Sequence, residues 1–204
     1  MRWVIFFAFI GCFITSCSLT KIDSSNWMDS AYVPGTQTRM LVIANTDDKQ
    51  LQQEYENRMA LQLKNKGIIP LKMHKLLPQI PYKEERTDEE VEQIVTLFKE
   101  KGIRTVLLAS QKSVETKEVA SRLSFKNYMN SIEPLRTDGV VNKNLSYDMV
   151  EQTTYTVEAV VYDLAKSQGN RAVASTTVVA VNPDSKEKVV RRFFKEIELL
   201  FGKR

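Results

Sequence analysis

The sequence contains little of what most catalytic and cofactor sites are made from: two cysteines, one histidine and seven glycines in 204 residues. A lone imidazole cannot form a typical zinc site without carboxylate partners, and none lies at helical spacing from His74. None of the glycines has the spacing of a phosphate-binding loop. We therefore expect no metal, nucleotide or other cofactor, and we interpret His74 as a surface residue at the end of a strand.

Positive charge is spread along the chain. The formal net charge is +4, and no basic stripe carries the interleaved aromatic rings that nucleic-acid binding favours. This pattern argues against a nucleic-acid partner. A mildly basic surface suits an anionic membrane or glycan instead.

An apolar run stands near the amino terminus. Residues 3–15, WVIFFAFIGCFIT, follow the basic residue Arg2. A helix that crosses a bilayer needs roughly 20 apolar residues, so this run of 13 is too short. It predicts a secretory signal peptide over residues 1–16.

The end of this run, Ile14-Thr15-Ser16-Cys17, resembles the bacterial lipobox. The resemblance implies that Cys17 becomes the new amino terminus and carries lipid, palmitate included, with enough acyl chains for stable anchoring. Cys12 is a poorer site because the apolar run before it is too short. A plain signal peptide with an incidental cysteine, or an uncleaved amino-terminal anchor, are the alternatives.

Lipidation of Cys17 has two consequences. If Cys12 leaves with the signal peptide, the mature chain has no free thiol and no disulfide, which excludes thiol catalysis and a cysteine metal site. It also places the protein in the bacterial cell envelope. Ser18 after the cysteine indicates the outer membrane, by analogy with the sorting rules of some bacteria.

Residues 39–204 predict a single α/β domain of the mixed-sheet, α+β kind. The apolar run at 40–44, followed by polar residues that cap helices, predicts a buried strand that leads into a helix. Two successive strand-helix-strand units predict parallel pairing. The expected order is β-α-β-α-β-β-β-α, with helices mainly on one face of the sheet. The expected strands are 40–44, 68–73, 104–113, 153–164 and 171–181, and the expected helices are 48–66, 87–102 and one that starts near 184. The last two strands flank turn residues at 166–170, which predicts a hairpin.

Two segments lack such periodicity. Residues 17–38 are rich in Ser and Thr, with Asp and one Gly among them, and predict a flexible tether between the lipid and the domain. Residues 117–150 are polar with scattered rings and predict a functional excursion or a hidden short helix. Tyr128 and Tyr147 are candidate partner-contact residues in this excursion.

Carboxylates gather at Thr87-Asp88-Glu89-Glu90, but a structural role explains them. Thr87 and Glu90 have the spacing of a capping box, in which each side chain bonds the other residue's backbone amide. Acidic residues in the first turn also complement the helix macrodipole. We interpret this cluster as a helix start and not as a catalytic pair.

The sequence resembles a family of uncharacterised bacterial envelope lipoproteins. The resemblance is carried by residues 40–48, Leu76-Leu77-Pro78, residues 87–90, residues 155–163 and the closing helix. The order of strands and helices is more distantly similar to the TolB amino-terminal domain and to LpoB-like lipoproteins. Those proteins work by contact with other proteins, so the resemblance implies a binding role.

We expect a non-catalytic, membrane-anchored binding or adaptor module, because no acid, base, nucleophile or metal set stands out. Its expected partners are the membrane, through Cys17, and an envelope protein. Two alternatives stay open. One is an envelope enzyme acting on cell-wall or lipid material with a site built from distant residues, and the other is a scaffold subunit of a transport assembly.

Overall fold

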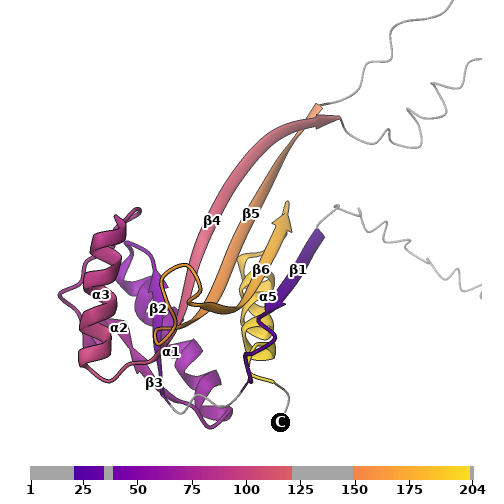
Figure 1. Ribbon diagram of the computed structural model, residues 1–204. Helices are drawn as coiled ribbons and strands as arrows, with labels where there is room; N and C mark the ends of the chain where they lie inside the picture. Colours follow the sequence, from indigo (N-terminus) through magenta and orange to yellow (C-terminus); the bar gives the residue numbers. More distant parts are fainter. Residues whose placement is uncertain (1–20, 35–38, 121–148, 203–204) are drawn as a thin grey trace, which may run out of the picture.

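The structure, a computed structural model, describes residues 21–34, 39–120 and 149–202 (Figure 1). They form a single domain with one mixed sheet of six strands, which confirms the expected α+β class. Its elements, in chain order, are β1 (Lys21–Met28), β2 (Arg39–Asn45), α1 (Lys49–Asn65), β3 (Ile69–Lys72), α2 (Met73–Leu76), α3 (Asp88–Glu100), β4 (Thr105–Ala120), β5 (Met149–Asp163), β6 (Ala172–Val181) and α5 (Lys186–Leu199).

The strand order is β1-β6-β5-β4-β2-β3. The half made of β4, β2 and β3 is parallel, and helices connect its strands, as the two predicted strand-helix-strand units require. The other half is antiparallel and includes the predicted hairpin of β5 and β6. Strand β3 lies at the edge, where Pro70 costs little because an edge strand leaves one side unpaired.

Strand β2 is buried on both faces of the sheet. Met40 and Val42 pack in the core under α1 and α5, whereas Leu41 packs in the core under α2 and α3. This double burial explains the continuous apolar run at 40–44. The two longest helices, α1 and α5, share one face, and α3 with α2 covers the other face beside β2 and β4.

The flexible tether expected at 17–38 is wrong for the described residues. Residues 21–28 form β1, which pairs antiparallel with β6 along its whole length. Ile22 packs on the core, Asp29 forms an ion pair of 2.7 Å with Lys166, and Tyr32 is buried. The strand has few apolar residues because backbone hydrogen bonds to β6, which need no particular side chain, hold much of it in place.

The polar excursion expected at 117–150 is wrong at both of its ends. Strands β4 and β5 continue as a paired ribbon up to the pair Ala120↔Met149, beyond the last pair of β5 with β6, Thr154↔Val181. Most of this ribbon is exposed, so burial does not select apolar residues at alternate positions. We call residues 116–120 and 149–153 the arm, which extends away from the rest of the sheet (Figure 1).

Candidate binding pocket

A pocket of about 770 Å³ lies between the sheet and α3, mainly on the face opposite α1 and α5, and the first turns of α1 reach its rim. Its volume is within the range of natural small-molecule sites, about 300–1,000 Å³. Its floor is apolar and combines side chains of three strands with one side of α3. These floor residues are Ile43, Val106, Leu108, Tyr162, Val91, Ile94, Val95 and Phe98.

The sheet topology explains why a pocket forms at this place. From β2 the chain passes to β3 on one side and then crosses to β4 on the other side. In open α/β sheets, such a reversal leaves a crevice beyond the carboxyl ends of the strands. Asn45, Thr46 and Asp47, which end and follow β2, line the pocket.

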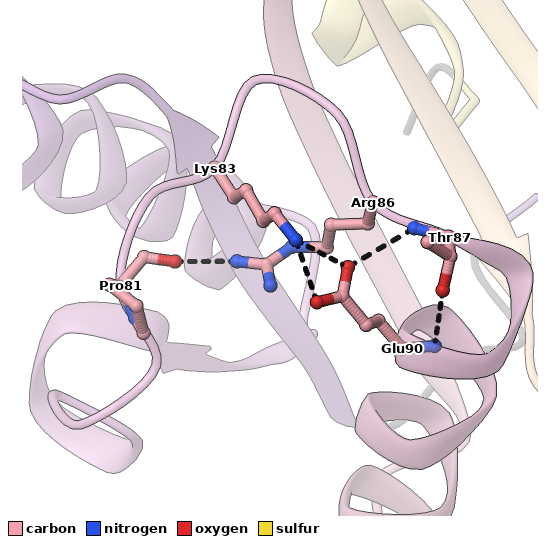
Figure 2. Close-up of polar contacts among 5 residues, drawn as sticks. All are labelled: Pro81, Lys83, Arg86, Thr87 and Glu90. Carbon is pink, nitrogen blue, oxygen red and sulfur yellow. Dashed lines mark hydrogen bonds and ion pairs between the residues drawn. The ribbon is translucent and has the colours of Figure 1, made fainter.

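The segment from Pro81 to Arg86 forms one wall and is tied to the start of α3 (Figure 2). Lys83 Nζ donates to both carboxylate oxygens of Glu90, at 2.7 and 2.8 Å, and Arg86 donates to the carbonyl of Pro81. Glu90 also accepts from the backbone N–H of Thr87, so the predicted capping box is confirmed. The carboxylate of Glu90 therefore caps the amino terminus of α3 and also holds the wall formed by residues 81–86.

Electrostatics strengthens this arrangement at neutral pH. The hydrogen bond from Lys83, and then that from the Thr87 amide, hold the pKa of Glu90 below its ordinary value of 4.5. Glu90 is therefore charged at neutral pH, which is the form that these two hydrogen bonds favour.

A second ion pair closes the pocket where α3 meets the start of β6. Arg171 donates through both terminal nitrogens to Glu92, at 2.6 and 2.8 Å. The hydrogen bond from Arg171 lowers the pKa of Glu92. Two parallel hydrogen bonds fix orientation as well as distance, so this pair holds α3 at a defined position over the sheet.

His74 lines the pocket and is not the surface residue expected from the sequence, because a buried acid holds it. Its Nδ1 lies 2.6 Å from Glu56 Oε2, which also accepts from the His74 backbone N–H at 2.9 Å. Glu56 has an exposed fraction of 0%, and its second oxygen accepts from the backbone N–H of Ala44. The pair thus joins α1, β2 and α2 behind the pocket.

One sequence signal could have revealed this pair. Glu56 stands three residues before Met59 and seven before Leu63, on the buried face of α1. A carboxylate in such a position needs hydrogen-bond donors, because a buried unpaired charge is costly. The position of His74 as the main donor follows only from the fold, since α2 was not predicted.

The rim of the pocket carries more unpaired negative than positive charge. Lys83 and Arg171 are engaged in the ion pairs above, which leaves two lining cations, Lys49 and Arg86, without an ion pair in the described part of the chain. Three rim carboxylates take part in no ion pair within the described part of the chain: Asp47, Glu84 and Asp88. On the floor, burial is the main cause that raises the pKa of the Tyr162 phenol, so its hydroxyl remains a neutral donor at neutral pH.

The predicted site residues are not among the residues that the structure describes. Cys17, Tyr128 and Tyr147 fall outside the described residues, so lipid attachment and partner contact there stay predictions. Within residues 21–34, 39–120 and 149–202, no three side chains of His, Cys, Asp or Glu form a possible metal site. The helices of these same ranges include none that is long and apolar enough to span a membrane.

No protein-family model matches the sequence, and no curated protein matches it. Similar solved structures include a PelC dodecamer from Paraburkholderia phytofirmans, with 9% identity over 91% of this chain and 99% of that chain, at a TM-score of 0.43. The lipoprotein GNA1162 from Neisseria meningitidis has 10% identity over 81% of this chain and 99% of that chain, at a TM-score of 0.40.

A DUF4136 family protein from Bacteroides thetaiotaomicron has 11% identity over 88% of this chain and 91% of that chain, at a TM-score of 0.32. A lipoprotein is therefore among the structures that this chain is similar to. At these scores the similarities carry no argument about function. The expected similarity to the TolB amino-terminal domain and to LpoB stays a prediction.

Proposed function

We propose that the protein is a non-catalytic binding module of the bacterial cell envelope, anchored by lipid on Cys17, and that the pocket under α3 is its binding site. The proposed location is the outer membrane, on the basis of Ser18 after the lipobox-like residues. The pocket is the observation that carries the proposal, because it combines an apolar floor with a polar rim and walls fixed by ion pairs.

The lining of the pocket defines the chemistry of the ligand. Floor residues such as Phe98 and Ile94 favour an apolar body. At the rim, Asp47, Glu84 and Asp88 favour a cationic or hydrogen-bond-donating group. We infer a ligand with an apolar part and a basic end, such as a small amphiphile or a side chain of an envelope protein.

A fluorescent probe tests the pocket directly. The apolar dye N-phenyl-1-naphthylamine should show saturable emission with the purified chain. Val91→Trp fills the pocket between α3 and the sheet, so it should weaken binding by about tenfold, which equals 1.4 kcal/mol.

Leu61→Trp is the matched control, since Leu61 is exposed on α1, on the opposite face of the sheet. It should bind the dye as wild type does. Equal binding by wild type and Val91→Trp would show that the dye binds elsewhere and would remove the support for this site.

The pair of His74 and Glu56 favours a second candidate, the envelope enzyme. Because Nδ1 of His74 bonds to Glu56, Nε2 is the nitrogen that could accept a proton as a general base. The test is incubation with cell-wall fragments and phospholipid vesicles, followed by mass spectrometry of the products. Turnover that His74→Gln abolishes and Lys75→Gln retains would favour this candidate over the binding module.

A further inference from the structure

His74 brings a largely enclosed polar group into the lining of the pocket. Its side chain has an exposed fraction of 11%, whereas the rim carboxylates Asp47, Glu84 and Asp88 are exposed. Water competes strongly for hydrogen bonds at an exposed rim and weakly at an enclosed group. The group that a ligand offers to His74 should therefore affect its affinity more than the group it offers to the rim.

One oxygen of Glu56 fixes the imidazole of His74 at two points. Oε2 lies 2.6 Å from Nδ1 of the ring and accepts from the His74 backbone N–H at 2.9 Å. The second bond also serves α2, because Lys72, the residue before this helix, gives its first turn no side-chain cap. Glu56 is itself fully buried and accepts from the Ala44 amide. The ring is therefore held in place before any ligand binds.

The hydrogen bonds of Glu56 indicate which ring nitrogen carries the hydrogen. Glu56 accepts from two backbone N–H groups, those of His74 and Ala44, as an ionised carboxylate does. A neutral imidazole beside such a carboxylate donates to it, so we assign the hydrogen of the ring to Nδ1. Nε2 then keeps its lone pair and is a hydrogen-bond acceptor.

Nε2 is open to the pocket. It has no hydrogen-bond partner among residues 21–34, 39–120 and 149–202. Within the same ranges, the buried polar side-chain atoms without a partner are Gln62 Oε1, Thr176 Oγ1 and Arg192 Nε, and they do not include Nε2. Nε2 is therefore accessible to solvent. Because His74 lines the pocket, the pocket is the space from which a ligand reaches it.

A ligand that fills the pocket displaces water from Nε2. A ligand with an N–H or O–H at this point replaces the lost hydrogen bond, whereas a methyl group leaves the acceptor unsatisfied. Enclosed sites that bond a polar group of their ligand reject analogues without that group for this reason. The rim carboxylates are also acceptors, so the rim and Nε2 favour the same chemistry in a ligand.

We propose that Nε2 of His74 selects the ligand of the pocket by accepting a hydrogen bond from it. The ligand class is an apolar body that carries a hydroxyl, amide or amine donor. The proposal deepens the proposed function, on which it rests, because it adds an enclosed contact to the exposed contacts at the rim. His74 is then a specificity-determining residue, and Glu56 is the residue that positions it.

Two probes of similar shape test the selection. 1-Naphthol has an O–H donor where 1-methylnaphthalene has a methyl group, and each would displace N-phenyl-1-naphthylamine from the purified chain. The informative quantity is the ratio of the two affinities, compared between wild type and a His74 variant. The free energy of removing each probe from water is the same for both proteins, so it cancels in this comparison.

Two substitutions of His74 separate its two nitrogens. His74→Asn keeps an amide N–H near the position of Nδ1, and with it the bond to Glu56, but has no atom at the position of Nε2. We expect it to shift the ratio about tenfold toward 1-methylnaphthalene, with urea stability close to wild type. His74→Gln places its amide near Nε2 instead, so it should keep most of the preference for 1-naphthol and lose stability. An unchanged ratio in folded His74→Asn would overturn the proposal.

Nitrogen NMR tests the same contact without a substitution. His74 is the only histidine in the sequence, so ¹⁵N-histidine labelling of a chain without a histidine tag reports on this ring alone. We expect Nδ1 to resonate as a protonated nitrogen and Nε2 as an unprotonated one. 1-Naphthol should move the Nε2 signal toward the protonated position, and 1-methylnaphthalene should not. A protonated Nε2 in the free protein, or no response to bound 1-naphthol, would overturn the proposal.

The dye itself separates this proposal from the proposed function. Dye binding that Val91→Trp weakens, together with an unchanged ratio in His74→Asn and a silent Nε2 signal, would overturn the role of His74 and leave the pocket as a binding site. Equal dye binding by wild type and Val91→Trp would instead overturn the pocket, and the proposal with it.

Discussion

The Nδ1 atom of His74 lies 2.6 Å from Oε2 of Glu56, although the two residues are 18 positions apart. The carboxylate is fully buried and accepts from three donors: the His74 ring, the His74 amide and the Ala44 amide. It thereby connects a helix, a strand and the short helix that holds one side of the pocket. Most of the stability of this region should depend on this carboxylate.

Glu56→Ala should lower the free energy of unfolding by about 2–4 kcal/mol, because it leaves buried donors without an acceptor. Urea denaturation measures the loss. Glu54→Ala, two residues earlier on the exposed side of α1, is the control and should stay within about 0.5 kcal/mol of wild type. Equal stability of the two variants would contradict the structural role of Glu56.

The stabilisation that the ion pair of Glu90 and Lys83 gives to the fold should depend on pH. A carboxyl whose pKa is lower in the folded than in the unfolded state stabilises the fold above its ordinary value, here 4.5, and this contribution is lost as pH falls below it. Glu90→Gln should therefore lower Tm near neutral pH, and the difference from wild type should shrink below pH 4.5. A Tm difference between wild type and Glu90→Gln that stays constant from neutral pH to below pH 4.5 would show that the charge on Glu90 does not stabilise this contact.

Tyr32 should make the domain sensitive to alkali. Burial raises the pKa of its phenol from 10.0 to about 12. The folded state keeps a proton that the unfolded state releases, so stability is full below pH 10.0 and falls as pH rises toward 12. Tyr32→Phe should remove up to about 2–3 kcal/mol of this fall, as measured by urea denaturation at each pH. A fall as steep as that of wild type would contradict the prediction.

Strand β1 should behave as part of the domain and not as a tether. Asn26 donates to Glu196 of α5 at 2.9 Å, and Arg192 donates to Ser24 at 2.7 Å and forms an ion pair with Glu196. Hydrogen exchange should show protected amides in residues 21–28, and Glu196→Ala should make them exchange faster. Unprotected amides throughout residues 21–28 of the wild type would contradict this prediction and support the flexible tether expected from the sequence.

The parts of the fold that sequence predicted well are those with local signals. The run at 40–44, the Thr87–Glu90 capping box and the turn at 166–170 each specify an element through neighbouring residues, and each element is present. Strand β1 and the arm have no such signal. They depend on backbone pairing with distant strands, and solvent on their exposed faces imposes no apolar pattern.

The pocket could not be predicted from sequence for a different reason. Its lining comes from the ends of strands, one side of α3, the wall at 81–86 and the loop before β6, and no two of these segments share a motif. Charge pairs such as Arg171 with Glu92 join residues 79 positions apart. Only the topology of the sheet, with its reversal at β2, brings these segments together.

Attachment through Cys17 is the central claim, and intact mass with membrane fractionation tests it most directly. Wild type and Cys17→Ser would be expressed side by side in a bacterial host that lipidates envelope proteins. We predict that wild type begins at Cys17, carries acyl chains and remains with the membranes, whereas Cys17→Ser carries none and is released. An unmodified wild-type Cys17 in a protein that separates from the membranes would contradict the account.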